Sequence, residues 1–297
     1  MSGTFVFIHG TGRPDSSGDR LRIRAALDAQ QWFADWELVC PPWGERVAGT
    51  WGNPLDALPP EQRTAIEPDG ADAASFDAVV QALGAELAAE LAAPTRETTA
   101  GGVRAEAAIP DFVLAAVTSA IAAHRARVTV AVGDFVRNVF VYFHRRDDIR
   151  DWIVEEVARV RAQMGGPLVV AGHSIGGVIA VDALTHRPQP RTLLVTAGSQ
   201  MPLFATLRLS DPIGSGGIRP FAPWLNVYNP RDPVAFYAST VFPPEPVFPP
   251  GTGPSVTSPT DVELTHPKHL PEVHTAYFEE PALYERIRAR LEALGFA

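Results

Sequence analysis

The fold is decided by the stretch from 168 to 184, which reads Leu168-Val-Val-Ala-Gly-His-Ser-Ile-Gly-Gly-Val-Ile-Ala-Val-Asp-Ala-Leu184. Its first residues form an apolar, β-branched run that predicts a buried strand over Leu168–Ala171, and its last residues predict a helix over Gly176–Leu184. The two are joined by Gly172-His-Ser-Ile-Gly176, a G-x-S-x-G pattern in its strand–turn–helix context. Such a turn raises a serine hydroxyl at the carboxyl end of a sheet, so Ser174 is the candidate nucleophile.

Strand and helix patterns alternate on both sides of this stretch. The predicted strands are Thr4–Ile8, Glu37–Cys40, Leu168–Ala171, Thr192–Thr196 and Trp224–Tyr228, and the predicted core helices are Asp19–Phe33, Asp151–Gln163, Gly176–Leu184 and Pro281–Leu294. This alternation is typical of an α/β fold, with a mostly parallel central sheet flanked by helices. A Pro- and Gly-rich loop is predicted between Pro243 and Thr260.

The alternation is interrupted between residues 51 and 146. Helical patterns there cover Ala71–Ala93, Ala105–His124 and Gly133–His144, and the β-branched run Val128–Val132 leaves a strand as an alternative. We therefore predict a discontinuous core formed by 1–50 and 147–297, with 51–146 as a mainly helical cap or lid inserted into it.

Composition narrows the functional classes. The chain has 297 residues, 46% of them hydrophobic, and a net charge of −9, which argues against a disordered chain and against a binder of duplex nucleic acid. Cys40 is the only cysteine, so no intrachain disulfide is expected. The first ten residues lack the charged region of a signal peptide, and the longest apolar stretch, Phe112–Ala123, is too short to span a bilayer. These features predict a cytoplasmic protein with at most peripheral membrane contact.

A serine nucleophile needs a base, and the histidines after the G-x-S-x-G turn are His186, His266, His269 and His274. His186 ends the helix that leaves the turn, and His266 and His269 stand beside Pro and Lys in a loop. His274 comes just before the final helix, after the last strand. We therefore predict His274 as the base.

The carboxylate that orients such a base is expected between the nucleophile and the histidine in chain order. Asp232 lies in a turn after the strand Trp224–Tyr228 and fits this order, with Asp211 and Asp261 as competitors. Asp182 is excluded, because it lies two turns along the helix that follows Ser174.

The negative charge formed on attack requires donors, usually two backbone N–H groups. Ile175 follows the nucleophile and offers one, and Thr11 in the loop after the first strand is the candidate for the other. A dinucleotide site is excluded in that loop, because Gly10-x-Gly12 would need a third glycine where Asp15 stands.

The histidine-rich segment also contains potential metal ligands. These are His266, His269 and His274, with Asp261, Glu263 and Glu272 nearby. Their spacing matches no pair of ligands on a helix such as H-E-x-x-H, and prolines interrupt it. We therefore predict no metal site in this segment.

Together these motifs resemble the α/β-hydrolase superfamily of serine hydrolases, in particular its bacterial lipase-like and serine-esterase members. The resemblance covers about 1–50 and 147–297. It rests on Phe5-Val-Phe-Ile-His-Gly-Thr-Gly12, Val170-Ala-Gly-His-Ser-Ile-Gly-Gly177, Asn226-Val-Tyr-Asn-Pro-Arg-Asp-Pro-Val234 and His274-Thr-Ala-Tyr-Phe278. It implies an α/β-hydrolase fold and a Ser174–Asp232–His274 triad without a cofactor. Ile175 stands where relatives often have Leu, and Asn229 where they commonly have Asp.

These features predict hydrolysis of a small-molecule or lipid-like carboxylic ester through an acyl-enzyme. Acyl transfer and thioester cleavage by the same triad remain alternatives, as does a non-catalytic binding module. The predicted helix Ile109–Ala123 suits an acyl pocket or an interfacial contact, although apolar helices more often pack on a core. The residues expected to contact the substrate are His9, His173, Phe112, Val113 and Val117.

Overall fold

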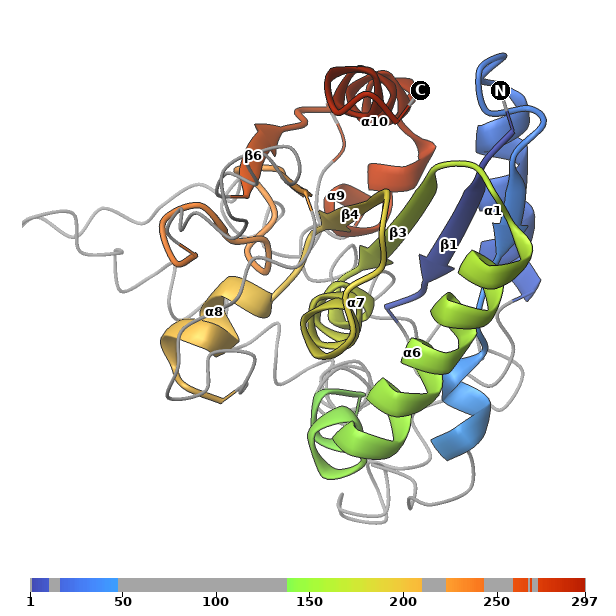
Figure 1. The fold of residues 1–297 in the computed structure, drawn as a ribbon. Helices are drawn as coiled ribbons and strands as arrows, with labels where there is room; N and C mark the ends of the chain where they lie inside the picture. The colour runs from blue at the N-terminus through green and yellow to red at the C-terminus, as the bar shows by residue number, and fades with distance from the viewer. Residues whose placement is uncertain are drawn as a thin grey trace, which may run out of the picture. The chain divides into compact units, whose positions relative to one another are not determined.

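The computed structural model describes residues 2–10, 17–47, 138–209, 223–242, 259–266, 268 and 272–296. The elements, drawn in Figure 1, are β1 (Thr4–Ile8), α1 (Ser17–Asp28), β2 (Glu37–Val39), η1 (Trp43–Val47), α6 (Arg146–Gln163), β3 (Leu168–His173), α7 (Ile175–His186), β4 (Thr192–Ala197), α8 (Met201–Thr206), β5 (Trp224–Tyr228), β6 (Thr260–Glu263), α9 (Glu272–Thr275), η4 (Tyr277–Glu279) and α10 (Pro281–Ala293). The predicted α/β class is confirmed.

The strands form one six-stranded sheet in the order β2-β1-β3-β4-β5-β6, and every neighbouring pair is parallel. The chain moves from β1 to β2 on one side and then returns to place β3 on the other side of β1. In open parallel sheets, ligands bind outside the carboxyl ends of the strands where the strand order reverses. The residues that follow β1 and β3 lie at this point.

Helices cover both faces of the sheet (Figure 1). On one face, alternate strand residues such as Val6, Val170 and Leu194 share a buried cluster with side chains of α6 and α7. On the other face, Phe5, Val169 and other alternate residues pack with α1 and α10. Because both faces are buried, the central strands are apolar throughout, which is why they are recognisable in the sequence.

Five elements of the structure were not predicted: η1, α8, β6, α9 and η4, of which η1, α9 and η4 have five residues or fewer. β6 is an edge strand whose residues are exposed or half-buried, so Thr260–Glu263 carries no apolar alternation. α8 is six residues long, which is too short for a helical period to show. α6 begins at Arg146 instead of the predicted Asp151, with Asp147 and Asp148 in its first turn, where acidic side chains suit the helix dipole.

The chain divides into two compact units, Met1–Thr50 with Asn138–Ala297, and Trp51–Arg137. The second unit lies outside the described residues, and so do the helices predicted at Ala71–Ala93 and Ala105–His124 and the strand considered at Val128–Val132. Residues 138–146, counted above with the insertion, belong to the first unit.

A polar contact joins this segment to the core. Val141 and Tyr142 of residues 138–146 are buried in the hydrophobic core. Tyr142 and Arg146 both donate hydrogen bonds to Asp182 of α7. The two bonds from Arg146 measure 2.7 and 2.6 Å, a bidentate arrangement. The Asp182 carboxylate therefore has a structural role, in agreement with its exclusion as the catalytic acid.

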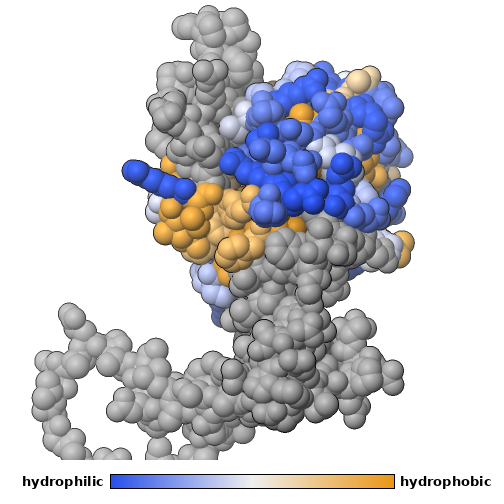
Figure 2. Space-filling model, turned by 90° about the horizontal axis from the view of Figure 1, so that it is seen from below, coloured by the Kyte–Doolittle hydropathy of each residue, from blue (hydrophilic) through white to orange (hydrophobic). Residues whose placement is uncertain are grey.

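Some apolar side chains of the first unit reach its surface, and Figure 2 shows hydrophobic surface next to hydrophilic surface on one face. The large hydrophobic residues that are exposed in the described part of the chain are Leu21, Phe140, Leu207, Leu209 and Tyr237. Phe143, near Phe140, contacts Phe204 of α8 with ring centroids 5.4 Å apart, so these segments pack together. None of the helices described here has the length and hydropathy that a bilayer span requires.

The start of α7 provides a test of the packing that defines the site. A Cβ on Gly176 would lie 2.1 Å from the carbonyl oxygen of Ile8 and 2.6 Å from that of His9. Both are backbone atoms, so we expect Gly176→Ala to lower the free energy of unfolding by about 3 kcal/mol in urea denaturation. Gly165→Ala is the control, because a Cβ there meets nothing within 4 Å. Equal stability of the two variants would contradict this close approach of α7 to β1.

Candidate active site

Ser174 stands at the sharp turn between β3 and α7. Its backbone has φ 54° and ψ −126°, a conformation that side-chain-bearing residues rarely adopt. The residue is 5% exposed, and Gly10 lies so close that a Cβ there would be 2.7 Å from the Ser174 Cβ. The turn therefore holds the Ser174 side chain at the reversal point of the strand order.

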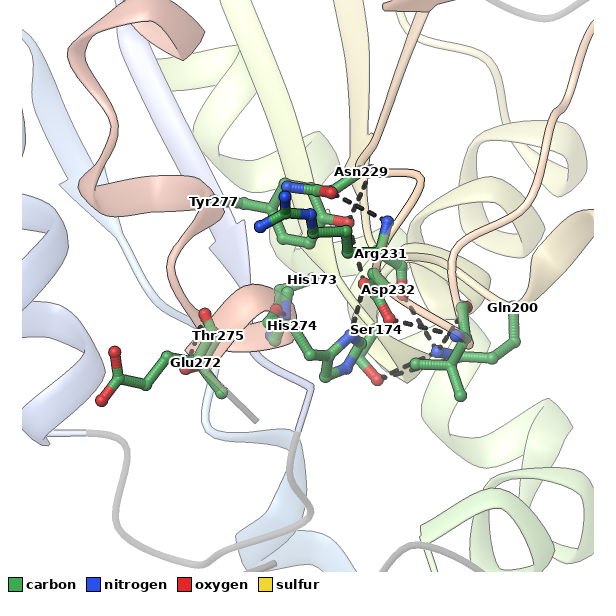
Figure 3. A network of polar contacts seen from close by, with 12 residues as sticks. His173, Ser174, Gln200, Asn229, Arg231, Asp232, Glu272, His274, Thr275 and Tyr277 are labelled. Carbon is green, nitrogen blue, oxygen red and sulfur yellow. Dashed lines mark hydrogen bonds and ion pairs between the residues drawn. The ribbon is translucent and has the colours of Figure 1, made fainter. Parts of the chain in front are cut away.

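The structure brings the predicted base and acid together. His274 lies in α9 and Asp232 in the turn after β5, and Nδ1 of His274 donates to Oδ2 of Asp232 at 2.8 Å. The carboxylate also accepts the Tyr277 hydroxyl at 2.8 Å and the Val234 N–H at 3.0 Å. Figure 3 shows Asp232 with His274 and Tyr277 in a network of polar contacts that also contains Ser174. Asp232 is thus bonded through both oxygens.

This environment keeps the carboxylate ionised. Burial alone would raise the pKa of Asp232, but the hydrogen bond and charge of His274, with the donors from Val234 and Tyr277, hold that pKa below its usual value. Burial and the neighbouring Asp232 carboxylate raise the pKa of Tyr277, so its hydroxyl stays a donor. An ionised carboxylate fixes the His274 tautomer with its proton on Nδ1, which leaves Nε2 as an acceptor.

His173 connects this pair to the turn. Its Nε2–H donates to the backbone carbonyl of His274 at 2.6 Å, and the two rings are 4.7 Å apart. Since His173 directly precedes Ser174, the contact holds α9 against the strand end that carries the serine. Burial, with a smaller contribution from His274, lowers the pKa of His173 to about 3, so its ring is neutral at pH 7.

A glycine at the end of β4 makes room for the acid and the base. Gly198 has φ +59°, and a Cβ there would lie 2.9 Å from Cε2 of Tyr277 and 3.1 Å from both Asp232 Oδ2 and His274 Cε1. A side chain at this position would be strained by its backbone and would also press on the pair.

Of the two expected oxyanion donors, Ile175 and Thr11, the structure describes only Ile175. Ile175 is the first residue of α7, where backbone N–H groups have no acceptor within the helix. Thr11 lies outside the described residues, although Gly10 before it contacts Ser174.

The other expected contact residues have different positions. His9 is buried and stacks on Trp43 with ring centroids 5.5 Å apart, and Trp43 donates to the His9 carbonyl. His173 is engaged with His274, as described above. Phe112, Val113 and Val117 lie outside the described residues.

The competing acids and bases are placed elsewhere or are not described. Asp261 of β6 accepts hydrogen bonds from Asn226 and from the backbone of Ala238 and Ser239, so it ties down the loop that carries Asp232. His186 is an exposed residue at the end of α7. His266 is buried, with its ring 6.4 Å from that of Tyr277. Asp211 and His269 lie outside the described residues.

Two polar residues at this site were not anticipated. Tyr277 follows His274 by three positions, so a single turn of chain brings its hydroxyl to the acid. Gln200 follows β4, the neighbour of the serine-bearing strand, and its side-chain amide lies 3.3 and 3.4 Å from the Ser174 hydroxyl oxygen. Within the described ranges, Gln200 is the hydrogen-bond partner of this hydroxyl, and the signal that could have identified it is its place at the end of a parallel strand next to β3.

No grouping of three or more His, Cys, Asp or Glu residues suited to a metal ion occurs in the described part of the chain. His274 and Asp261, both considered as potential ligands, are bound to protein partners as described above.

Comparison of the whole chain with models of protein families, with curated proteins and with solved structures finds no match in any of the three.

The neutral His173 predicts a pH dependence of stability. Between about pH 6.5, its ordinary pKa, and about 3, the unfolded chain binds a proton that the folded chain does not, so stability falls as the pH falls. This contributes up to about 1.4 kcal/mol per pH unit. We expect the unfolding free energy of His173→Gln, measured in urea from pH 7 to pH 5, to fall less steeply than that of the wild type. Parallel pH profiles would contradict the low pKa.

Proposed function

We propose that this chain is a serine hydrolase of the α/β-hydrolase superfamily that cleaves carboxylic esters through an acyl-enzyme. The observation that carries the proposal is a serine held at φ 54° in a strand–helix turn, beside an Asp–His pair joined at 2.8 Å. A serine hydroxyl requires such a pair to become nucleophilic. The chain order Ser174, Asp232, His274 is that of this superfamily.

The proposed α/β-hydrolase fold is supported by the position of each residue. Ser174 follows β3, Asp232 follows β5 and His274 follows β6, so all three come after the carboxyl ends of strands in one parallel sheet. The loop after β1, which is proposed to contribute an oxyanion donor, begins beside Ser174.

In the proposed reaction, Ser174 Oγ attacks the ester carbonyl carbon as its proton moves to Nε2 of His274. The carbonyl electron pair moves onto oxygen, where the N–H groups of Ile175 and Thr11 stabilise it. The protonated imidazole, oriented by Asp232, then gives its proton to the departing alcohol. Water, activated by His274, attacks the acyl-enzyme, and the proton returns to Ser174 when the acid is released.

The nucleophile is tested by labelling with a fluorophosphonate probe, with the modified peptide located by mass spectrometry. We expect wild-type protein to be labelled at Ser174 and Ser174→Ala to remain unlabelled while it stays folded. Ser199→Ala is the matched control, because Ser199 is a buried serine of the same region whose hydroxyl accepts from the Met201 N–H, and it should be labelled normally. A folded wild type that is not labelled would sink the proposal and favour a binding module.

The acid and base are tested by hydrolysis of a series of p-nitrophenyl esters. Asp232→Asn removes the charge that orients the imidazole, and we expect kcat to fall on the order of 10⁴-fold. His274→Ala should be as severely impaired, whereas His186→Ala, at an exposed position, should match the wild type. Full activity of His274→Ala would show that another group is the base. Products formed with added alcohol distinguish hydrolysis from acyl transfer.

A further inference from the structure

Gln200 is a buried polar residue that contacts the proposed nucleophile. It is 2% exposed and precedes α8, just after β4. β4 pairs in parallel with β3, and His173 is in register with Ala197, so the residues that follow the two strands meet at one edge of the sheet. Figure 3 shows the Gln200 amide reaching the Ser174 hydroxyl.

The surroundings of Gln200 fix the orientation of its amide. Nε2 lies 2.9 Å from the Gly198 carbonyl oxygen, 3.2 Å from that of Val234 and 3.3 Å from Ser174 Oγ. A flipped amide would direct Oε1 at two carbonyl oxygens, which have no proton to donate. The nitrogen therefore faces these acceptors.

The two N–H groups of this amide are shared among three acceptors. The Gly198 carbonyl, at the shortest distance, takes one of them, and the second lies between Val234 and Ser174 Oγ. Both contacts of Ser174 Oγ with this amide are long: 3.3 Å from Nε2 is just beyond the usual N–H···O range, whereas 3.4 Å from Oε1 is well beyond the usual O–H···O range. The hydroxyl oxygen thus accepts from Gln200, and its own proton is left for another acceptor.

Resting on the proposed function, we propose that Gln200 is a positioning residue that donates to Ser174 Oγ and directs the hydroxyl proton toward His274. Gln200 gains and loses no proton. The Oγ–H bond breaks toward Nε2 of His274 as the Oγ–carbon bond forms. Negative charge that develops on Oγ before this bond is complete strengthens donation from Gln200, since hydrogen bonds to charged groups are about twice as strong as neutral ones.

The same residue links the nucleophile to the acid. The Val234 carbonyl accepts from Gln200 at 3.2 Å, while the Val234 N–H donates to Asp232 at 3.0 Å. One backbone residue therefore contacts both the Gln200 amide and the acid. This arrangement requires a hydrogen-bond donor at position 200, because an apolar side chain there would remove the hydrogen bond that Gln200 gives to the carbonyl oxygens of Gly198 and Val234.

Two variants test the proposal through the second-order rate of fluorophosphonate labelling at Ser174, measured from pH 5 to pH 9 and expressed per folded protein. Gln200→Met has no donor, and we expect labelling to be about 10- to 100-fold slower, the effect of one hydrogen bond to a charged group. Gln200→Glu has a donor only while it is protonated. As it ionises, its carboxylate attracts the Ser174 proton, so its labelling should decline with rising pH, whereas labelling of the wild type should not.

The control is the same pair of substitutions at Gln163, an exposed residue at the end of α6, before β3 begins. These variants should be labelled like the wild type at every pH. Urea denaturation of all variants separates stability from rate. The changed pH profile of Gln200→Glu is the readout that a purely structural role would not produce.

The outcomes distinguish this proposal from the one on which it rests. A folded wild type without labelling at Ser174 overturns the proposed function and the role of Gln200 with it. A labelled wild type with Gln200 variants that keep its rate and pH profile overturns the role of Gln200 alone. Faster labelling of Gln200→Met also overturns it, because Gln200 would then hold the hydroxyl away from His274.

Discussion

The close approach of α7 to the ends of β1 and β3 is the constraint on which the rest of the site depends. A Cβ on Gly172 would lie 2.4 Å from the Gly176 carbonyl oxygen, and one on Gly176 would lie 2.1 Å from that of Ile8. A helix packed this tightly leaves the connecting residue little room, and Ser174 takes the strained φ of 54°. Backbone packing, rather than a side-chain contact, therefore directs the serine toward the edge of the sheet where ligands bind in α/β folds.

The buried carboxylate of Asp232 stays ionised at this edge of the sheet because protein groups donate hydrogen bonds to both of its oxygens. Asp232 accepts from His274, Tyr277 and Val234, and these donors together overcome the burial that would otherwise neutralise it. Tyr277 in turn accepts the Asn229 N–H at 2.9 Å, so the acid is braced from the loop on which it stands. Removal of one donor would leave part of this charge without compensation.

The loop that carries the acid is held by the edge strand. Asp261 of β6 binds the side chain of Asn226 and the backbone of Ala238 and Ser239, on either side of Asp232. Asn229 donates to the Leu264 carbonyl at 3.0 Å, which adds a second attachment. β6, the least apolar strand of the sheet, thus contributes its polar side chains to the position of the acid, and this explains a strand that hydrophobicity does not reveal.

The sequence by itself determined the features whose cause is local. The strand, the turn and the helix around Ser174 are encoded by neighbouring residues. The central strands are buried on both faces and are therefore apolar throughout, so they are visible in the sequence and the α/β class was predictable. Motif and chain order also marked Ser174, Asp232 and His274 as candidates, but only the tertiary structure decided which contacts their side chains make. Gln200 reaches Ser174 across 26 positions, and His274 reaches Asp232 across 42. Contacts of this kind depend on strand order and loop path, which arise from the packing of the whole sheet and leave no periodic pattern in the chain.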